Sequence, residues 1–308
     1  MKRPATIVPP LTPFTSDLRV DYDALAKGVD YVVDDCNATV VIAAGVEAQE
    51  YQYLGLEERK ELIHNTIDFV NRRRPVTVGV SHPSFRISIE LAAYAASMGA
   101  QSIQLLAPQR PTGGPPTTAE LVRYYEAVGR ETELPIMLYL NAGPGADVSV
   151  PATIELAKLD CIHYIKESSR DLSRVSRLIA EIELAGHAHY YVTMQMLLAS
   201  LMIGGSGVTL PPPAAKVADD IIEAFMSGDF RLAAELQKQF ALFPARWMPY
   251  GLAAVMKASL NYLGVPSGQP YPPYGPLEGA DLKALQEFLA TTDLVRDGRK
   301  PQLKKVTS

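Results

Sequence analysis

Lys166 is the residue whose type and position most directly suggest chemistry. It lies near the end of the short β-rich run CIHYIKE, where alternation places it on the same face as Ile162 and Tyr164. If that face is the interior of a barrel, loss of water lowers the pKa of the amine and raises its neutral fraction. A neutral amine in a dry pocket attacks ketones and forms a Schiff base. The pattern alone also allows the alternative that Lys166 forms an ion pair with Glu167 or Asp171.

Tyr139 is the second candidate for chemistry. It lies near the end of the run PIMLYL, and alternation turns it to the same side as Met137. This run and the run that carries Lys166 are consecutive strands, so the two side chains are expected to be neighbours. A phenol beside a Schiff-base lysine can relay the protons that the reaction needs. The alternative is a tyrosine that packs a barrel rim with its hydroxyl on a backbone carbonyl.

The elements that must position these residues alternate regularly. Short β-rich runs are each followed by an amphipathic stretch with helical spacing, and the cycle repeats eight times, which favours a closed parallel (β/α)₈ TIM barrel. The runs cover residues 6–14, 39–45, 75–80, 101–108, 135–140, 161–167, 189–193 and 207–210, with helices over 21–35, 56–72, 85–99, 117–131, 151–159, 171–184, 194–205 and 214–228. Chemistry in such a barrel gathers at the C-terminal ends of the strands.

A doubly wound sheet is the competing fold. It usually carries a glycine-rich phosphate turn after its first strand, whereas here the first run enters Pro9, Pro10 and Pro13. From Asp229 onward the pattern is wholly helical, over residues 230–243, 247–264 and 280–292. We therefore expect a barrel over residues 1–228, a C-terminal helical extension packed on it over 229–300, and a loose tail over 301–308.

Composition narrows the class of protein. Hydrophobic residues make up 47%, charged residues 20%, and the formal net charge is −5, values typical of a globular protein and unfavourable for nucleic-acid binding. The N-terminus lacks the apolar stretch of a signal peptide, and no apolar run approaches the roughly 20 residues of a membrane span. We expect a cytoplasmic protein with no membrane or nucleic-acid partner. The histidines show no metal-binding spacing and the two cysteines no CxxC pair, so no metal is expected.

The motifs around Lys166 and Tyr139 resemble those of a known family. The stretch YIKESSRDLSRV is similar to the lysine signature of the dihydrodipicolinate synthase and N-acetylneuraminate lyase family, and LPIMLYLNAGPG occupies the place of its tyrosine motif. Further similar stretches are VPPLTPFTSDLRVDYDAL, GLEERKEL, MSGDFRLAAEL and PYGLAAVMKASLNYLG. The resemblance implies a class I aldolase in which Lys166 forms the Schiff base and Tyr139 relays protons. It also implies a homotetramer or dimer that needs no cofactor.

The turn after the second strand departs from the family pattern. Where members usually carry two threonines that hold the substrate carboxylate, this chain has Glu47 and Ala48. The backbone N–H groups of Ala48 and Gln49 remain candidates to bind that carboxylate, although an ionised Glu47 beside it would repel it. Glu47 therefore points elsewhere, is protonated, recognises substrate hydroxyls or an amine, or acts as an acid or base. The alternative is that Glu47 has no functional role and is a rim residue paired with an arginine such as Arg110.

Two other family features are missing. The turn after the fifth strand, residues 142–146, has no arginine. In the run after the fourth strand, where family members carry a tyrosine that reaches across the dimer interface, this chain carries Arg110. The aspartate-semialdehyde reaction is therefore not expected. Arg110 either binds an anionic substrate group or is a surface residue. Thr193, Gln195 and Gly207, from the seventh and eighth strands, complete the candidates for substrate binding.

These observations predict a lyase that acts on a small 2-oxo acid. Lys166 condenses with the 2-oxo carbon, and the iminium accepts electrons from the adjacent carbon. The leading reaction is cleavage or formation of a C–C bond in a pyruvate-derived aldol. Dehydration of a 3-deoxy-2-oxo sugar acid through the same imine is the alternative, and a barrel that binds a ligand without catalysis is a remote one.

Overall fold

A closed parallel barrel forms the body of the computed structural model, which describes residues 3–46, 50–241 and 243–295. Within these residues eight strands follow one another around the barrel in sequence order, and the last pairs with the first. They are β1 (Ala5–Val8), β2 (Val40–Ala43), β3 (Val76–Gly79), β4 (Ser102–Leu106), β5 (Ile136–Leu140), β6 (Ile162–Glu167), β7 (His189–Val192) and β8 (Gly207–Thr209). The predicted (β/α)₈ fold is confirmed.

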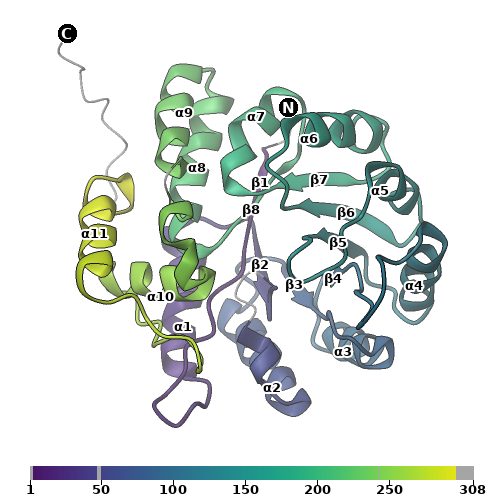
Figure 1. The fold of residues 1–308 in the computed structure, drawn as a ribbon, viewed down its shortest axis with the longest axis horizontal. Helices are drawn as coiled ribbons and strands as arrows, with labels where there is room; N and C mark the ends of the chain where they lie inside the picture. Colours follow the sequence, from purple (N-terminus) through teal and green to yellow (C-terminus); the bar gives the residue numbers. More distant parts are fainter. Residues whose placement is uncertain (1–2, 47–49, 242, 296–308) are drawn as a thin grey trace.

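Helices surround the barrel, one after each strand (Figure 1). They are α1 (Tyr22–Asp30), α2 (Leu56–Val70), α3 (Phe85–Ser97), α4 (Thr118–Arg130), α5 (Val150–Leu156), α6 (Leu172–Leu178), α7 (Leu197–Met202) and α8 (Pro212–Met226). Side-chain caps fix several of their starts: the side chains of Asp21, Thr117 and Asp171 each accept a hydrogen bond from a backbone N–H of the first turn. These caps define where each loop at the strand ends gives way to helix.

Strand alternation divides the side chains between two cores. Outward positions such as Val8, Val41 and Ile165 are fully buried under the helices. Inward positions fill the barrel, where Ile7, Ile42, Met137 and Tyr191 form a separate apolar cluster. The inner face that begins with this cluster continues upward to the C-terminal end of the barrel, so residues two positions further along a strand point into the barrel mouth.

Three more helices form the C-terminal extension: α9 (Phe230–Gln237), α10 (Leu252–Tyr262) and α11 (Gly279–Ala290). Figure 1 shows them together on one side of the barrel, next to α1 and α8. Helices α9 and α10 both contact α8, and α10 contacts α11. A short 3₁₀ segment, η6 (Ala245–Tyr250), precedes α10. The extension is therefore packed along the barrel wall.

Some element boundaries differ from the sequence-based expectation. The first strand ends at Val8, because Pro9 and Pro10 offer no N–H to a strand ladder. The helix expected over 247–264 begins only at Leu252, because Pro249 and Gly251, whose φ is 86°, interrupt it. The expected tail, residues 301–308, lies outside the described residues.

Candidate active site

Lys166 lies on the inner face of β6 at the C-terminal end of the barrel. In the strand register it is level with Tyr139 on β5 and with Tyr191 on β7. Only 2% of Lys166 is exposed, and burial lowers the pKa of its amine well below the usual value. The structure thus supplies the condition that the sequence argument required, an amine shielded from water inside the barrel.

Tyr139 is the immediate neighbour of this amine. The Lys166 Nζ lies 3.9 Å from the centroid of the Tyr139 ring. The Tyr139 hydroxyl accepts hydrogen bonds from Asn141 Nδ2 at 3.0 Å and from Ser168 Oγ at 3.4 Å. Burial raises the pKa of Tyr139, so the phenol carries its proton when the site is empty. The two donors would stabilise a phenolate once that proton has left.

The carboxylates next to Lys166 in the sequence have other partners. Glu167 faces the opposite side of β6, where Arg174 Nε donates to it at 2.8 Å and the Ser169 N–H at 2.9 Å. Asp171 caps α6 by accepting from the Ser173 N–H at 2.9 Å. These contacts hold the turn after β6 in place, and with it the Ser168 hydroxyl that meets Tyr139.

A cavity of about 550 Å³ opens above Lys166 and Tyr139. Its wall includes strand-end residues of β5 to β8, the 3₁₀ segment η2 (Glu50–Tyr53), and residues of the C-terminal extension. A volume of this size suits a small ligand. Thr193, one of the residues predicted to bind substrate, lines the cavity.

Thr209 is a cavity residue that sequence reasoning missed. It ends the inner face of β8, it is 1% exposed, and its Oγ1 has no hydrogen-bond partner among the described residues. A buried hydroxyl without a partner is costly, and a polar substrate atom would remove that cost. Alternation from Gly207 along GVT places Thr209 inward, so the strand period was the signal that could have found it.

Three other predicted contacts are absent from the cavity wall. Arg110 is exposed and binds both oxygens of Glu120 at 2.5 Å, so it is a surface residue. Gly207 lies deeper in the barrel, with φ of 141°. A Cβ at this position would lie 2.1 Å from the Ala5 carbonyl oxygen, so glycine here allows the close approach of β8 to β1. Gln195 is half-buried in η4 (Met194–Met196) and does not line the cavity. Glu47, Ala48 and Gln49 lie outside the described residues.

A buried ion pair ties the extension to the barrel mouth. Lys257 Nζ on α10 lies 2.8 Å from Glu50 Oε2, with side chains 1% and 3% exposed. The backbone N–H of Tyr271 donates to Glu50 at 3.1 Å, and Lys257 also donates to the Gln269 carbonyl at 2.8 Å. Burial raises the pKa of Glu50 and lowers that of Lys257, while the pair opposes both shifts. This pair fixes one wall of the cavity.

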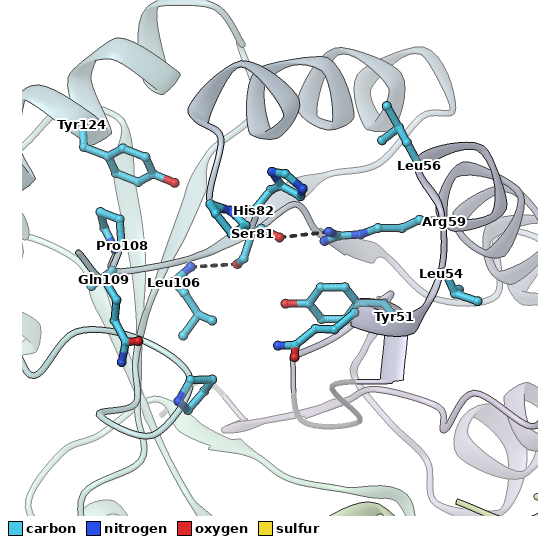
Figure 2. Close-up of a pocket in the computed structure, with 14 residues that line it drawn as sticks. Tyr51, Leu54, Leu56, Arg59, Ser81, His82, Leu106, Pro108, Gln109 and Tyr124 are labelled. Carbon is cyan, nitrogen blue, oxygen red and sulfur yellow. Dashed lines mark hydrogen bonds between the residues drawn. The ribbon is translucent and has the colours of Figure 1, made fainter. Parts of the chain in front are cut away.

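A second cavity of about 450 Å³ adjoins the first and shares Gln52 and Pro144 with it. Figure 2 shows Tyr51 and Tyr124 on opposite sides of it. Arg59, whose guanidinium lies 3.9 Å from the Tyr51 ring centroid, donates to the Ser81 and Gly79 carbonyls at 2.9 and 2.8 Å. Burial lowers the pKa of Arg59 to about 10. These contacts brace β3 against α2.

Comparison with known proteins decides the family. The chain matches the model of the dihydrodipicolinate synthetase family over residues 3–292. The chain belongs to this family. It is 28% identical over 280 residues to 4-hydroxy-tetrahydrodipicolinate synthase 1 of Halalkalibacterium halodurans, covering 90% of this chain and 92% of that one. It is 28% identical over 296 residues to the synthase of Archaeoglobus fulgidus, covering 92% and 96%.

Solved structures share the fold of this chain. YagE of E. coli K12, in complex with pyruvate, has a TM-score of 0.85 and 25% identity, covering 94% of this chain and 98% of that one. N-acetylneuraminate lyase of Mycoplasma synoviae has a TM-score of 0.81 and 20% identity, covering 94% and 97%. The prediction of a Schiff-base-forming lyase of the class I aldolase type is confirmed.

Two further observations concern other functional classes. Within the described residues no group of three or more His, Cys, Asp or Glu side chains is placed to hold a metal ion. None of the helices that the structure describes is long and apolar enough to cross a membrane.

Proposed function

We propose that Lys166 forms the Schiff base with a 2-oxo acid and that Tyr139 is the proton relay in a reversible aldol reaction. The observation that carries this proposal is the buried Lys166 amine, its pKa lowered by burial, 3.9 Å from the Tyr139 ring. The pyruvate in the related YagE structure supports a pyruvate-type substrate. The hydrogen bonds that the Tyr139 hydroxyl accepts from Asn141 Nδ2 and Ser168 Oγ support its role in proton transfer.

The first half of the reaction forms the imine. The neutral Lys166 amine adds to the 2-oxo carbon, and a proton moves from nitrogen to the former carbonyl oxygen. That hydroxyl then leaves as water with a proton from Tyr139, which leaves a protonated imine on Lys166 and a phenolate on Tyr139. The hydrogen bonds from Asn141 and Ser168 offset the cost of that buried phenolate.

The second half breaks the C–C bond of a 4-hydroxy-2-oxo acid. The Tyr139 phenolate takes the proton of the C4 hydroxyl, the bond between C3 and C4 breaks, and its electrons flow into the iminium to give an enamine. The C4 fragment departs as an aldehyde. Tyr139 returns its proton to C3, and water hydrolyses the imine to release the 2-oxo acid and free Lys166. Formation of the C–C bond is the same sequence in reverse.

The substrate contacts are proposals as well. We propose that the backbone N–H groups of Ala48 and Gln49 bind the substrate carboxylate, that Thr193 contacts a substrate hydroxyl, and that Thr209 donates to a polar substrate atom. The absence of an arginine from residues 142–146 argues against the synthase reaction on aspartate semialdehyde. A Glu47→Thr variant tests the turn, because a gain in pyruvate affinity is expected if Glu47 weakens the carboxylate site.

Borohydride trapping tests the central proposal. Protein is incubated with pyruvate and with a panel of other 2-oxo acids, reduced, and mapped by mass spectrometry. We expect a covalent mass increment on Lys166, its loss in Lys166→Ala, and its retention in Lys158→Ala, which removes an exposed lysine from the chain. No label on Lys166 with any acid, in folded protein, would overturn the proposal. Release of water from a 3-deoxy-2-oxo sugar acid without C–C cleavage would identify the dehydratase instead.

We also propose a cytoplasmic homo-oligomer, tetramer or dimer, that works without a cofactor. The Schiff base itself supplies the electron sink, which supports a reaction without an added group. Light scattering of the purified chain measures the oligomeric state. Full activity of protein treated with a chelator and passed over a desalting column is the expected result for the cofactor proposal.

A further inference from the structure

The outer half of the Lys166 cavity is lined by aromatic side chains. Tyr53 comes from η2, and Tyr250, Tyr271 and Tyr274 come from the extension; we refer to these four residues as the aromatic wall. Met248 lines the cavity beside them. Tyr53 and Tyr250 are each 38% exposed and Tyr274 is 61% exposed, so large apolar surface faces open space here. Such surface on the wall of a cavity indicates an apolar ligand group.

The rings of the aromatic wall are ordered against each other. Tyr53 stacks on Tyr271 with centroids 4.6 Å apart and an interplanar angle of 11°. Tyr274 lies 6.4 Å from Tyr53, tilted by 44°. The backbone N–H of Tyr271 is held by Glu50, whose carboxylate pairs with Lys257. The wall is thus anchored to the buried ion pair rather than left on free loops.

A hydroxyl of the aromatic wall is engaged in a hydrogen bond within the protein. The Tyr250 hydroxyl donates to Asp281 Oδ2 at 2.5 Å. A polyhydroxylated substrate tail needs donors and acceptors along the wall, and the Tyr250 hydroxyl already donates to Asp281. Ring faces stack best on another ring.

The charges on the cavity wall also favour an apolar ligand group. Glu50 is neutralised by Lys257, and Lys166 is assigned to the Schiff base. Among the described residues that line the cavity, Arg170 is the remaining charged side chain, and it is exposed at the rim. The part of the cavity wall that the structure describes around the four tyrosines is therefore suited to an uncharged group.

We propose that the aldehyde half of the substrate carries an aromatic ring. The inference deepens the proposed function and rests on it: the 2-oxo acid end is bound at Lys166, and the ring of the aldehyde lies against the aromatic wall. In the forward condensation, the enamine C3 of Lys166-bound pyruvate attacks the carbonyl carbon of an aromatic aldehyde. The new C3–C4 bond forms, the aldehyde oxygen takes the proton from Tyr139, and hydrolysis of the imine releases a 4-aryl-4-hydroxy-2-oxobutanoate.

The test measures condensation of pyruvate with benzaldehyde and with glyceraldehyde, with each product quantified by mass spectrometry. We expect kcat/KM for benzaldehyde to exceed that for glyceraldehyde by about tenfold or more. Tyr53→Ala and Tyr274→Ala should each reduce this ratio by about fivefold to tenfold, whereas Tyr53→Phe and Tyr274→Phe, which keep the ring, should preserve it. Tyr262→Ala is the matched control, because Tyr262 is 39% exposed on α10 and does not line the cavity.

Borohydride trapping of pyruvate on Lys166 separates the two proposals. If Lys166 is labelled but glyceraldehyde is preferred, or the preference for benzaldehyde survives both alanine variants in folded protein, the aromatic inference is overturned and the proposed function stands. If Lys166 is not labelled, both are overturned. Benzaldehyde preference that depends on the rings at positions 53 and 274 supports the inference.

Discussion

At the scale of single residues, the chemistry depends on two side chains whose burial shifts their pKa values in opposite directions. Burial lowers the pKa of Lys166 and raises that of Tyr139, which favours the neutral form of both groups. A neutral amine is a nucleophile and a neutral phenol is an acid, and imine formation needs one of each. Burial in the barrel interior therefore favours the form of each partner that imine formation needs.

The pH dependence of imine formation follows from the lowered pKa of Lys166. The amine stays neutral at pH values where an exposed lysine, with a pKa of 10.5, is protonated. We expect the trapping rate with pyruvate to remain nearly constant from about pH 10 down to the lowered pKa and to fall only below it, because protonation removes the lone pair. Borohydride quench at a series of pH values measures this. A rate that rises about tenfold per pH unit from neutral pH to 10 would contradict it.

Tyr139→Phe tests the proton relay. The variant keeps the ring beside Lys166 but loses the hydroxyl that Asn141 and Ser168 contact. We expect imine formation to remain detectable while turnover falls by about 10² or more, since general acid–base catalysis contributes factors of this size. Steady-state kinetics with trapping in parallel gives both quantities. An unchanged kcat would remove Tyr139 from the mechanism.

Thr209→Val tests the unpartnered hydroxyl on β8. The substitution keeps the shape and removes a buried polar atom that has no partner among the described residues, so the free energy of unfolding should be unchanged or higher. If the hydroxyl contacts substrate, KM should rise by about threefold to tenfold. Chemical denaturation and kinetics on the same protein separate the two effects. A lower stability with unchanged KM would show that the hydroxyl serves the fold.

At the scale of elements, the extension and the barrel mouth are joined by the ion pair of Lys257 on α10 with Glu50 on η2. Both groups are almost fully buried, so removing one partner leaves the charge of the other buried without a counter-charge and without hydration. The pair also holds Tyr271, and through it the aromatic wall. Its loss should therefore affect both stability and the shape of the cavity.

A double-mutant cycle measures this pair. Lys257→Met and Glu50→Gln should each lower the free energy of unfolding by about 3 to 5 kcal/mol, and the double variant should lose clearly less than the two together. Lys283→Met and Glu287→Gln provide the control, because that pair on α11 is 3.7 Å apart and mostly exposed, and it should matter little. Additive losses for Glu50 and Lys257 would mean that they do not stabilise each other.

The alternation of side chains made much of the site predictable from the sequence. The inward placement of Lys166 and Tyr139 followed from the period of their strands, the repeated cycles predicted the barrel, and the roles of the two residues came from the resemblance to the family. Asn141 and Ser168 directly follow those strands, so they could have been found from the rule that strand ends carry function. The ion pair of Glu50 and Lys257 carries no such signal, because its members are far apart in the sequence and meet only through packing of the extension.

The positions of Arg110 and Gly207 show where a sequence pattern misleads. Arg110 follows a strand end, but Glu120, which also caps the next helix by accepting from the Thr117 N–H, holds it at the surface. Gly207 lies in a strand whose end lines the cavity, but it is needed where two backbones approach. Neither local contact is visible in spacing alone.

At the scale of the whole molecule, the barrel depends on closure between its first and last strands. Residues Ala5, Thr6 and Ile7 pair with Gly207, Val208 and Thr209, and this seam is the contact that makes the sheet continuous. The seam is tight at Gly207, where any side chain would meet the Ala5 backbone. Closure also fixes the position of Thr209 relative to Lys166.

Gly207→Ala is expected to destabilise the whole fold. The added Cβ would lie 2.1 Å from the Ala5 carbonyl oxygen, and φ of 141° is unfavourable for alanine. Overpacking of this kind costs about 1 to 3 kcal/mol or more, measured by chemical denaturation. Gly114→Ala is the matched control, since a Cβ there has open space around it. Equal stability of the two variants would show that the seam tolerates a side chain.

The cavity wall has two sources, the strands of the barrel and the extension after residue 228. The proposed bond-making groups, Lys166 and Tyr139, both come from the barrel, while Tyr250, Tyr271 and Tyr274 come from the extension. Mutational drift or laboratory evolution confined to the extension can therefore exchange one aldehyde for another without disturbing the imine. Such a protein can acquire new substrates by changes after residue 228 alone, and a library built there is the place to look for them.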